Sequence, residues 1–386
     1  MEADLEKILY AELFGGGGGA ALEEGPVSLS LEATYSSLPS YARSAAWHPS
    51  GGWVAVTSNT APKVSILRFN RTLKTFTSVA TYAAGTYADM FWNSAGTRLL
   101  MADTSTLRVL EFNQATEALS LRGSYAPGNT IWAACWHPDE DRVLISWADG
   151  AGDGIRVLNY NDSTGAFTVG LSRFVTSYKF NWLSFNADGD RLLGVQSSGS
   201  VSSATIMYSF VRATNAFATV ATASPACFSP SQGVWSPDYS HIAISSTQST
   251  YGPRLWIHSF DKVAGTLTLV ARLLGPSQGT LDAVFGFTSP CWSADGSRIF
   301  MGATGSGLVG RGIYMAALYK GTWRVLGYTP TASSGPSQGM LSLDPLEGRF
   351  LIAGDTIDHV HCYELVTGKT LVEIDRRVYA YAGEVE

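Results

Sequence analysis

The stretch Trp292-Ser293-Ala294-Asp295-Gly296 joins an aromatic residue to a short polar turn, and the apolar run beginning at Ile299 follows it. The same order, an aromatic or apolar anchor, a turn containing Pro, Asp or Gly, and an apolar segment, recurs along the chain. The other copies are Trp47-His48-Pro49-Ser50-Gly51, Trp92-Asn93-Ser94-Ala95-Gly96, Trp136-His137-Pro138-Asp139, Phe185-Asn186-Ala187-Asp188-Gly189, Trp235-Ser236-Pro237-Asp238 and, more weakly, Leu343-Asp344-Pro345.

The spacing of these anchors predicts the fold. Successive anchors are 45, 44, 49, 50, 57 and 51 residues apart, close to the roughly 40 to 50 residues of a four-stranded propeller blade. The sequence therefore predicts an all-β fold, a seven-bladed β-propeller of four-stranded antiparallel blades.

Strand signals follow each anchor in the same order. In the second unit, Arg98 to Ala102 reads as a strand, Leu107 to Phe112 alternates as the next, and Asn113 to Glu117 reads as a turn before a fourth strand. Alternation with a period of two suits a sheet whose two faces differ. Strands packed between neighbouring blades should be more continuously apolar.

The closure of the ring stays open at this point. Val27 to Tyr35 resembles the fourth strands at Thr75 to Tyr82 and Leu119 to Tyr125, yet it precedes the first anchor. Thr370 to Arg377 also reads as a fourth strand for the seventh blade. The N-terminal strand could replace that strand, flank it, or pair with another chain.

Two segments divide the chain, an N-terminal arm at 1–26 and the propeller at 27–386. The arm predicts a short amphipathic helix on a tether of five glycines, Gly15 to Gly19. A helix this short needs something to pack on, either its own propeller or a partner chain. We predict a partner-binding arm with the apolar residues Leu5, Ile8, Leu9, Leu13 and Phe14.

Composition narrows the class of protein. Of 386 residues, 45% are hydrophobic and only 15% are charged, with a formal net charge of −6, against about 25% charged residues in a typical soluble protein. No basic run could follow a phosphate backbone, which argues against nucleic-acid binding. No apolar stretch is long enough to predict membrane insertion, and the first residues lack the pattern of a secretory signal.

Motifs of enzyme chemistry are scarce. The four cysteines form no CxxC pair, and no nucleophile elbow, zinc-protease motif or P-loop is present. We therefore predict no catalytic residue, no cofactor and no metal. Asp89, Asp282 and Arg43 lie just before anchors and are the charged residues that could point toward a central channel.

Three histidine and aspartate patterns have structural explanations. His48 and His137 occupy equivalent turns, which indicates a shared structural role. His359 and His361 would lie on one side of a strand, but the sequence offers no third metal ligand nearby. Asp149 to Gly154 loosely resembles a calcium loop, and we interpret it as a hairpin turn.

A repeated tetrapeptide suggests a surface on one face of the disc. Pro-Ser-Gln-Gly occurs at 230–233, 276–279 and 336–339, before the last three anchors, where we expect connections between blades. Duplication of a good turn is one explanation, and an arc that contacts a partner or a sugar is another. The predicted face contacts are Gln232, Gln278, Gln338, Trp132, Trp182, Phe285 and Phe287.

The units at Trp47 to Tyr82, Phe91 to Gly123 and Trp292 to Leu326 resemble WD-repeat-like and surface-layer-type propeller repeats of bacteriophage structural proteins. This resemblance implies a non-enzymatic virion component of the tail, neck, fibre or decoration. It would dock on other virion proteins through its arm, would present its faces to partners or to a host glycan or receptor, and would be assembled in the host cytoplasm.

Two alternatives belong to other classes. Trp47 to Gly51 is similar to blade turns of lactonase and carboxymuconate-cyclase propellers, which implies a propeller enzyme without transferring any catalytic residue. A cellular protein-interaction scaffold is the other, although the charged loops typical of one are mostly lacking.

Overall fold

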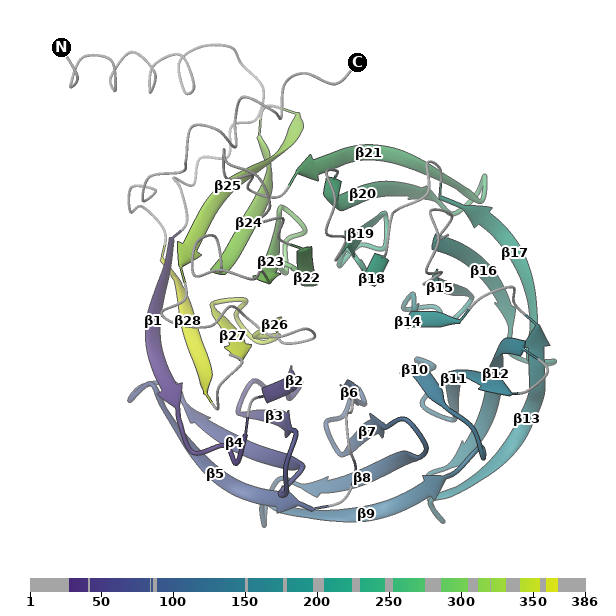
Figure 1. Ribbon diagram of the computed structural model, residues 1–386, viewed down its shortest axis with the longest axis horizontal. Helices are drawn as coiled ribbons and strands as arrows, with labels where there is room; N and C mark the ends of the chain where they lie inside the picture. The colour runs from purple at the N-terminus through teal and green to yellow at the C-terminus, as the bar shows by residue number, and fades with distance from the viewer. Residues whose placement is uncertain are drawn as a thin grey trace.

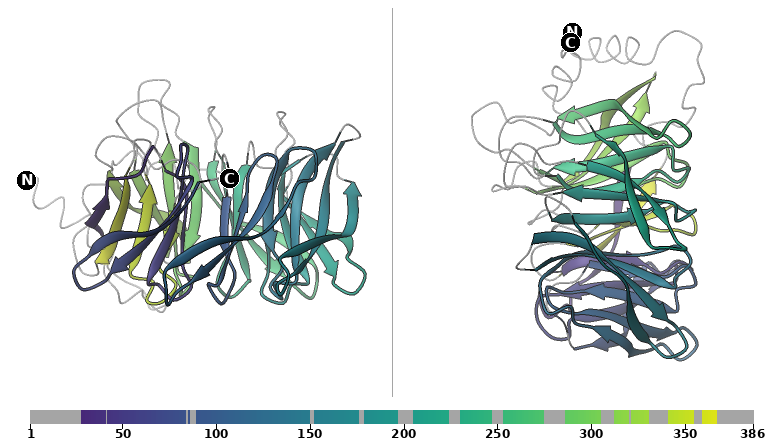
Figure 2. Two further views of the ribbon diagram at one scale, coloured as in Figure 1. Left: turned by 90° about the horizontal axis from the view of Figure 1, so that it is seen from below. Right: turned by 90° about the vertical axis from the view of Figure 1, so that its right-hand side faces the viewer.

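The computed structural model describes residues 28–40, 42–83, 85, 89–149, 152–175, 179–196, 205–223, 230–246, 253–274, 286–304, 312–319, 321–330, 341–354 and 359–366. They form seven four-stranded antiparallel sheets arranged as the blades of a disc around a central axis (Figure 1). Seen from the side, the strands run from one face of the disc to the other (Figure 2). The predicted seven-bladed propeller is therefore confirmed.

The strands run outward from the axis in chain order within blades 1 to 6. The innermost strands are β2 (Ala42–Trp47), β6 (Asp89–Trp92), β10 (Ile131–Trp136), β14 (Phe180–Phe185), β18 (Pro230–Trp235), β22 (Gly286–Trp292) and β26 (Leu341–Leu343). The second strands are β3 (Trp53–Ser58), β7 (Arg98–Ala102), β11 (Arg142–Asp149), β15 (Arg191–Gln196), β19 (His241–Ser246), β23 (Arg298–Thr304) and β27 (Phe350–Gly354).

The third and fourth strands form the outer half of each blade. The third strands are β4 (Val64–Asn70), β8 (Leu107–Asn113), β12 (Gly152–Asn161), β16 (Thr205–Val211), β20 (Pro253–Asp261), β24 (Gly312–Tyr319) and β28 (Val360–Val366). The outermost strands are β5 (Thr75–Tyr82), β9 (Ala118–Tyr125), β13 (Ala166–Val175), β17 (Ala216–Thr222), β21 (Thr266–Leu274), β25 (Thr322–Pro330) and β1 (Ser28–Tyr35).

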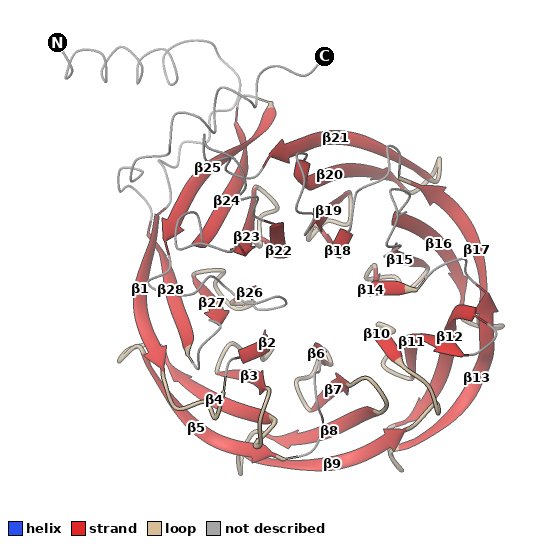
Figure 3. Ribbon diagram, viewed as in Figure 1, coloured by secondary structure: helices blue, strands red, loops and turns tan. Residues whose placement is uncertain are grey.

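Each anchor ends an innermost strand, and the polar turn after it leads into the second strand (Figure 3). The backbone N–H of Gly51 donates to the His48 carbonyl at 2.8 Å, and Gly51 has a φ of 67°. Glycine enters this left-handed region without the steric cost of a Cβ. We call the face of the disc that carries these turns the lower face, and the opposite one the upper face.

The apolar core lies between blades. One cluster of buried apolar residues occupies each of the seven interfaces between neighbouring blades. The second and third strands contribute to both sides, which explains why they read as nearly continuous apolar runs.

The anchors also tie the blades together by hydrogen bonds. The indole N–H groups of Trp92, Trp136, Trp235 and Trp292 each donate to a carbonyl of the preceding blade's innermost strand, at 3.2–3.3 Å. An aromatic anchor therefore both fills the core and satisfies a buried carbonyl.

The two turn histidines act in the same way, so their predicted structural role is confirmed. The buried Nε2 of His48 bonds to the carbonyl of Gly96, and that of His137 bonds to the carbonyl of Gly189, at 2.9 and 3.2 Å. Each histidine thus links its own lower turn to that of the next blade.

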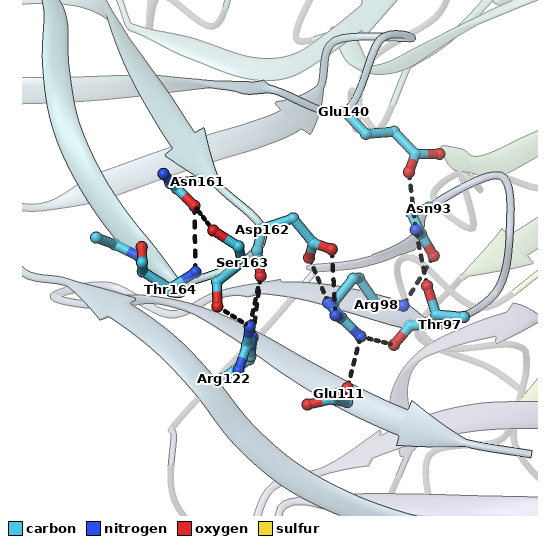
Figure 4. A network of polar contacts seen from close by, with 11 residues as sticks. Asn93, Thr97, Arg98, Glu111, Arg122, Glu140, Asn161, Asp162, Ser163 and Thr164 are labelled. Carbon is cyan, nitrogen blue, oxygen red and sulfur yellow. Dashed lines mark hydrogen bonds and ion pairs between the residues drawn. The ribbon is translucent and has the colours of Figure 1, made fainter.

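Polar contacts between neighbouring blades supplement this packing. Figure 4 shows the junction of blades 2 and 3, where Arg98 Nε donates to Asp162 at 2.6 Å and Asn93 Nδ2 donates to Glu140 at 2.8 Å. Asp162 is mostly exposed, so solvent weakens the ion pair, and the junction depends mainly on the apolar cluster beneath it.

The ring closes through the N-terminal strand. β1 pairs antiparallel with β28, from Ser28 opposite Val366 to Tyr35 opposite Val360, and becomes the outermost strand of blade 7. Of the options that the sequence left open, the structure selects the N-terminal strand as the fourth strand of this blade. Thr370 to Arg377 and the predicted helical arm at 1–26 lie outside the described residues.

No helix among the described residues is long and apolar enough to cross a membrane.

One polar residue occupies a position in the core that is apolar in other blades. His258 of β20 occupies the position that Leu67, Leu110 and Leu158 hold in the first three blades, and like them it has no exposed surface. Neither ring nitrogen has a hydrogen-bond partner in the part of the chain that the structure describes. Burial lowers the pKa of His258 to about 4 because the apolar surroundings disfavour the charged ring.

We expect the His258→Leu substitution to stabilise the protein. At neutral pH, it removes two unsatisfied buried nitrogens, which cost about 1–3 kcal/mol per buried polar group. In the wild type, the unfolded chain takes up a proton near pH 6.5 and the folded chain only near pH 4. Stability due to this group is therefore lost as pH falls through that window. Urea unfolding from pH 7.5 to 4 should give a shallower decline for the variant, and parallel curves would contradict this account.

Candidate functional site

The innermost strands share a register that directs alternate residues toward the axis. A register shift precedes Ser44 in β2, Trp182 in β14 and Gln232 in β18, and it aligns these three residues at the same level of their blades. Successive residues of a strand point to opposite faces. The side chains at this level and two residues further along therefore face the central channel.

The channel holds a cavity of about 500 Å³, within the size range of small-molecule sites. Six of the seven innermost strands line it, and β10 does not. The Trp182 ring reaches across that blade to Phe91 of β6, with ring centroids 5.5 Å apart in an edge-to-face contact. Beneath it, β10 carries only the small buried residues Ala133 and Cys135 at the channel positions.

The described side chains that line the cavity carry no formal charge at neutral pH. Its polar groups are the hydroxyls and the amide of Ser44, Ser184, Gln232, Ser236, Ser289 and Ser342. Its aromatic groups are Phe91, Trp182, Phe185, Trp235, Tyr239 and Trp292. Burial raises the pKa of the Cys291 thiol, also in the lining, to about 12, so this thiol is not the nucleophilic thiolate.

The indole N–H of Trp182 is buried and has no hydrogen-bond partner among the described residues. By contrast, Ser342 is engaged, because its Oγ accepts from the backbone N–H of Trp47 at 3.1 Å. A buried donor without a partner is costly, and a polar ligand atom in the channel could satisfy it.

Only two residues of the innermost strands are charged, Arg43 in β2 and Asp89 in β6. Asp89 pairs with Ala102, the counterpart of Thr57, which pairs with Ser44. Asp89 is therefore at the register level of Ser44, one blade away from Arg43. The sequence pointed to both residues, and Asp282 lies outside the described residues.

The predicted location of the tetrapeptide at 230–233 is wrong. It forms β18, the innermost strand of blade 5, instead of a connection between blades. Gln232 consequently lines the channel. The copies with Gln278 and Gln338 lie outside the described residues, so an arc of three such segments stays a prediction.

The predicted aromatic contacts have different surroundings. Trp182 lines the channel, and Trp132 is 39% exposed with Lys179 Nζ 3.6 Å from its ring centroid. Phe287 is fully buried against Tyr314. It is therefore a core residue, because its side chain turns into the interface of blades 5 and 6. Phe285 and the arm residues Leu5 to Phe14 lie outside the described residues.

The remaining candidates offer little to a metal. His361 Nδ1 bonds to Thr34 Oγ1 at 3.1 Å, with the His359 ring beside it. Asp149 ends β11 and pairs with Gly152 at the start of β12, as expected for two strands joined by a hairpin.

One cluster was missed by the sequence analysis, His137 with Asp139 and Asp141. The Arg212 guanidinium already bonds to both carboxylates, at 2.8 and 2.7 Å. The Arg212 guanidinium therefore already balances the negative charge of these two carboxylates.

Sequence reasoning also missed the channel serines and Tyr239. The signal was available as distance from the anchor, because Ser44 and Ser289 stand three residues before it and Ser184 and Ser342 stand one before it. Without knowledge of the register shift, that distance does not say which residues face the axis.

No protein-family profile and no curated protein matches this sequence. Solved structures do match. The Cps50 (Swd1) β-propeller domain of Myceliophteria thermophila has a TM-score of 0.63 at 10% identity, covering 88% of this chain and 100% of that one. The periplasmic gluconolactonase PpgL of Pseudomonas aeruginosa has a TM-score of 0.66 at 12% identity, covering 84% and 96%. A putative 6-phosphogluconolactonase of Bacteroides uniformis has a TM-score of 0.60 at 17% identity, covering 77% and 85%.

These likenesses show the shared propeller fold, and they correct the functional prediction. Two of the three structures are named as lactonases and none as a virion protein. They contradict the prediction of a non-enzymatic bacteriophage component and favour its lactonase-type alternative.

Proposed function

We propose that this protein is a lactone hydrolase whose central channel binds an uncharged sugar lactone. The observation that carries the proposal is the lining of the cavity, which combines hydroxyls, an amide and aromatic rings with no charged side chain among the described residues. The likeness to two propellers named as lactonases supports the reaction class, although a fold alone does not determine chemistry.

A sugar lactone has both polar groups and an apolar ring face, and this lining can contact both. Ser44, Ser289 and Gln232 can exchange hydrogen bonds with ring hydroxyls, since each offers both a donor and an acceptor. Trp182 offers an apolar ring surface to the C–H face of the sugar and an unpartnered N–H to one of its oxygens.

Asp89, which the strand register places at the level of Ser44, is the residue we assign to the reaction. Asp89 acts as general base and takes a proton from water while the water oxygen bonds to the lactone carbonyl carbon. The indole N–H of Trp182 and the amide of Gln232, both in the lining, offset the negative charge that develops on the carbonyl oxygen. The ring C–O bond then breaks, the proton passes from Asp89 to the departing oxygen, and an open-chain hydroxy acid leaves.

We expect the protein to hydrolyse δ-gluconolactone faster than the uncatalysed reaction, and Asp89→Asn to lower kcat at least about 100-fold, the usual contribution of a general base. The measurement is a pH-stat or indicator assay of acid release. Glu111→Gln is the matched control, because it also replaces a carboxylate of blade 2 by an amide. Glu111 pairs with Arg98, away from the channel.

A charged substrate tests the proposal that the channel binds an uncharged lactone. The uncharged lining should favour δ-gluconolactone over its 6-phosphate, because no described lining residue could pair with the phosphate. Absence of any rate above background for neutral sugar lactones would overturn the proposal. A preference for the 6-phosphate would overturn the uncharged substrate class.

A further inference from the structure

Tyr239 has an unusual backbone for its residue type. It lies in the lower turn of blade 5, where its N–H donates to the Ser236 carbonyl at 2.9 Å, and its φ is 59°. The same bond and a positive φ occur at the equivalent positions of four other blades, and there the residue is glycine, namely Gly51, Gly96, Gly189 and Gly296. A bulky side chain in this region is strained.

The neighbouring blade explains why a side chain fits at this place. A Cβ on Gly96 or Gly189 would come within 2.4 Å of the ring of His48 or His137, the histidines of the preceding blade. Before Tyr239, the preceding blade carries the shorter Asn186 instead of a histidine. Space for a side chain therefore exists, but space does not offset the strain.

Blade 3 also has a large residue at this position, and there hydrogen bonds to the neighbouring blade offset the strain. Glu140, with a φ of 60°, accepts hydrogen bonds from Asn93 Nδ2 and from the backbone N–H of Ser94. These bonds join two blades. Tyr239 makes no comparable polar contact among the described residues. Its ring rests on Trp235, with centroids 5.9 Å apart, and is 37% exposed.

Tyr239 also extends the channel. Together with Ser236 and Pro237, it carries the lining of the cavity from the axis to the lower face of blade 5. Trp182, Trp235 and Tyr239 thus provide aromatic surface from the middle of the channel to its lower mouth. Strained residues that persist in a structure concentrate at ligand sites.

We propose that Tyr239 and Trp235 form a second sugar subsite at the lower mouth, so that the substrate is the lactone of a disaccharide acid. This inference rests on the proposed function and names its substrate class. The lactone ring occupies the central level near Trp182 and Gln232, and the second ring stacks on Tyr239. Tyr239 is a specificity residue, since it contacts the substrate away from the reacting bond.

The test compares cellobionolactone with δ-gluconolactone as substrates of wild type, Tyr239→Gly and Tyr239→Phe. Tyr239→Gly installs the residue that four blades already carry, so the turn should form. We expect it to raise KM for cellobionolactone about five- to tenfold, the value of one aromatic stacking contact, and to leave KM for δ-gluconolactone unchanged. Tyr239→Phe should retain most of the wild-type KM. Glu140→Gly makes the equivalent change outside the channel and should alter neither KM.

Binding of unreactive sugars gives a readout that does not depend on catalysis. Tryptophan fluorescence titrations with cellobiose and glucose should show tighter cellobiose binding, lost in Tyr239→Gly. If both lactones are hydrolysed and Tyr239→Gly affects neither KM, the subsite is overturned while the hydrolase stands. If cellobiose binds through Tyr239 but no lactone is hydrolysed, the subsite stands and the hydrolase fails. If no sugar binds and no lactone is hydrolysed, both are overturned.

Discussion

A chain that begins at Ser36 is expected not to form the closed propeller. This truncation removes β1, and with it seven residue pairs with β28. Ala33 and Tyr35 leave the cluster between blades 7 and 1, and Leu29 leaves the cluster between blades 6 and 7. The truncation also deletes Glu32, which pairs with Lys74 of blade 1 at 2.6 Å. The exposed edge of β28 should then promote aggregation.

The matched control is a chain that begins at Val27, which lacks the arm but keeps β1. Size-exclusion chromatography with light scattering should give a compact monomer for 27–386, and aggregates or an expanded chain for 36–386. A synthetic peptide of residues 27–40 should restore the compact form, because it supplies the missing strand. A folded 36–386 monomer with the unfolding midpoint of 27–386 would contradict the role of β1 in closure.

The Asp344→Ala substitution is expected to destabilise the same junction by about 3–5 kcal/mol, the usual cost of removing one partner of a buried ion pair. The Asp344 side chain is fully buried, and its two oxygens accept from Arg71 of blade 1 at 2.6 and 2.8 Å. Its Oδ1 also accepts from the backbone N–H of Leu346 at 3.0 Å. The substitution therefore leaves Arg71 partly buried without its main partner and loosens the turn after β26.

Urea unfolding followed by tryptophan fluorescence measures this loss. Asp295→Ala is a suitable comparison, since Asp295 also accepts hydrogen bonds within its own turn but is mostly exposed. Its removal should cost about 1 kcal/mol. A double-mutant cycle with Arg71→Met isolates the pair. Equal losses for the two aspartates would show that closure does not depend on the Arg71 to Asp344 contact.

Much of the candidate site was beyond the sequence analysis. Gln232 and Trp182 were predicted to lie on one face of the disc. For Gln232 the reason was that Pro-Ser-Gln-Gly reads as a turn from local preferences. In the structure, Gln232 lies in a strand whose register shift turns it to the axis. That shift depends on pairing with β19 and cannot be read from β18 alone.

The number of blades, their order and the position of each lower turn can be read from the sequence. These features depend on local signals, an anchor, a turn and alternating strands, that repeat at nearly constant spacing. The structural role of His48 and His137 could be inferred for the same reason, since the two residues recur at equivalent positions.

The packing of the blades establishes which strand closes the ring, which residues meet in the channel, and that Tyr239 lies at its lower mouth. β1 and β28 are more than 300 residues apart in the chain, and the cavity draws on six blades. Contacts between residues so distant in sequence form only when the seven blades pack around one axis. No local pattern specifies them, because each blade supplies only one or a few side chains to the shared site.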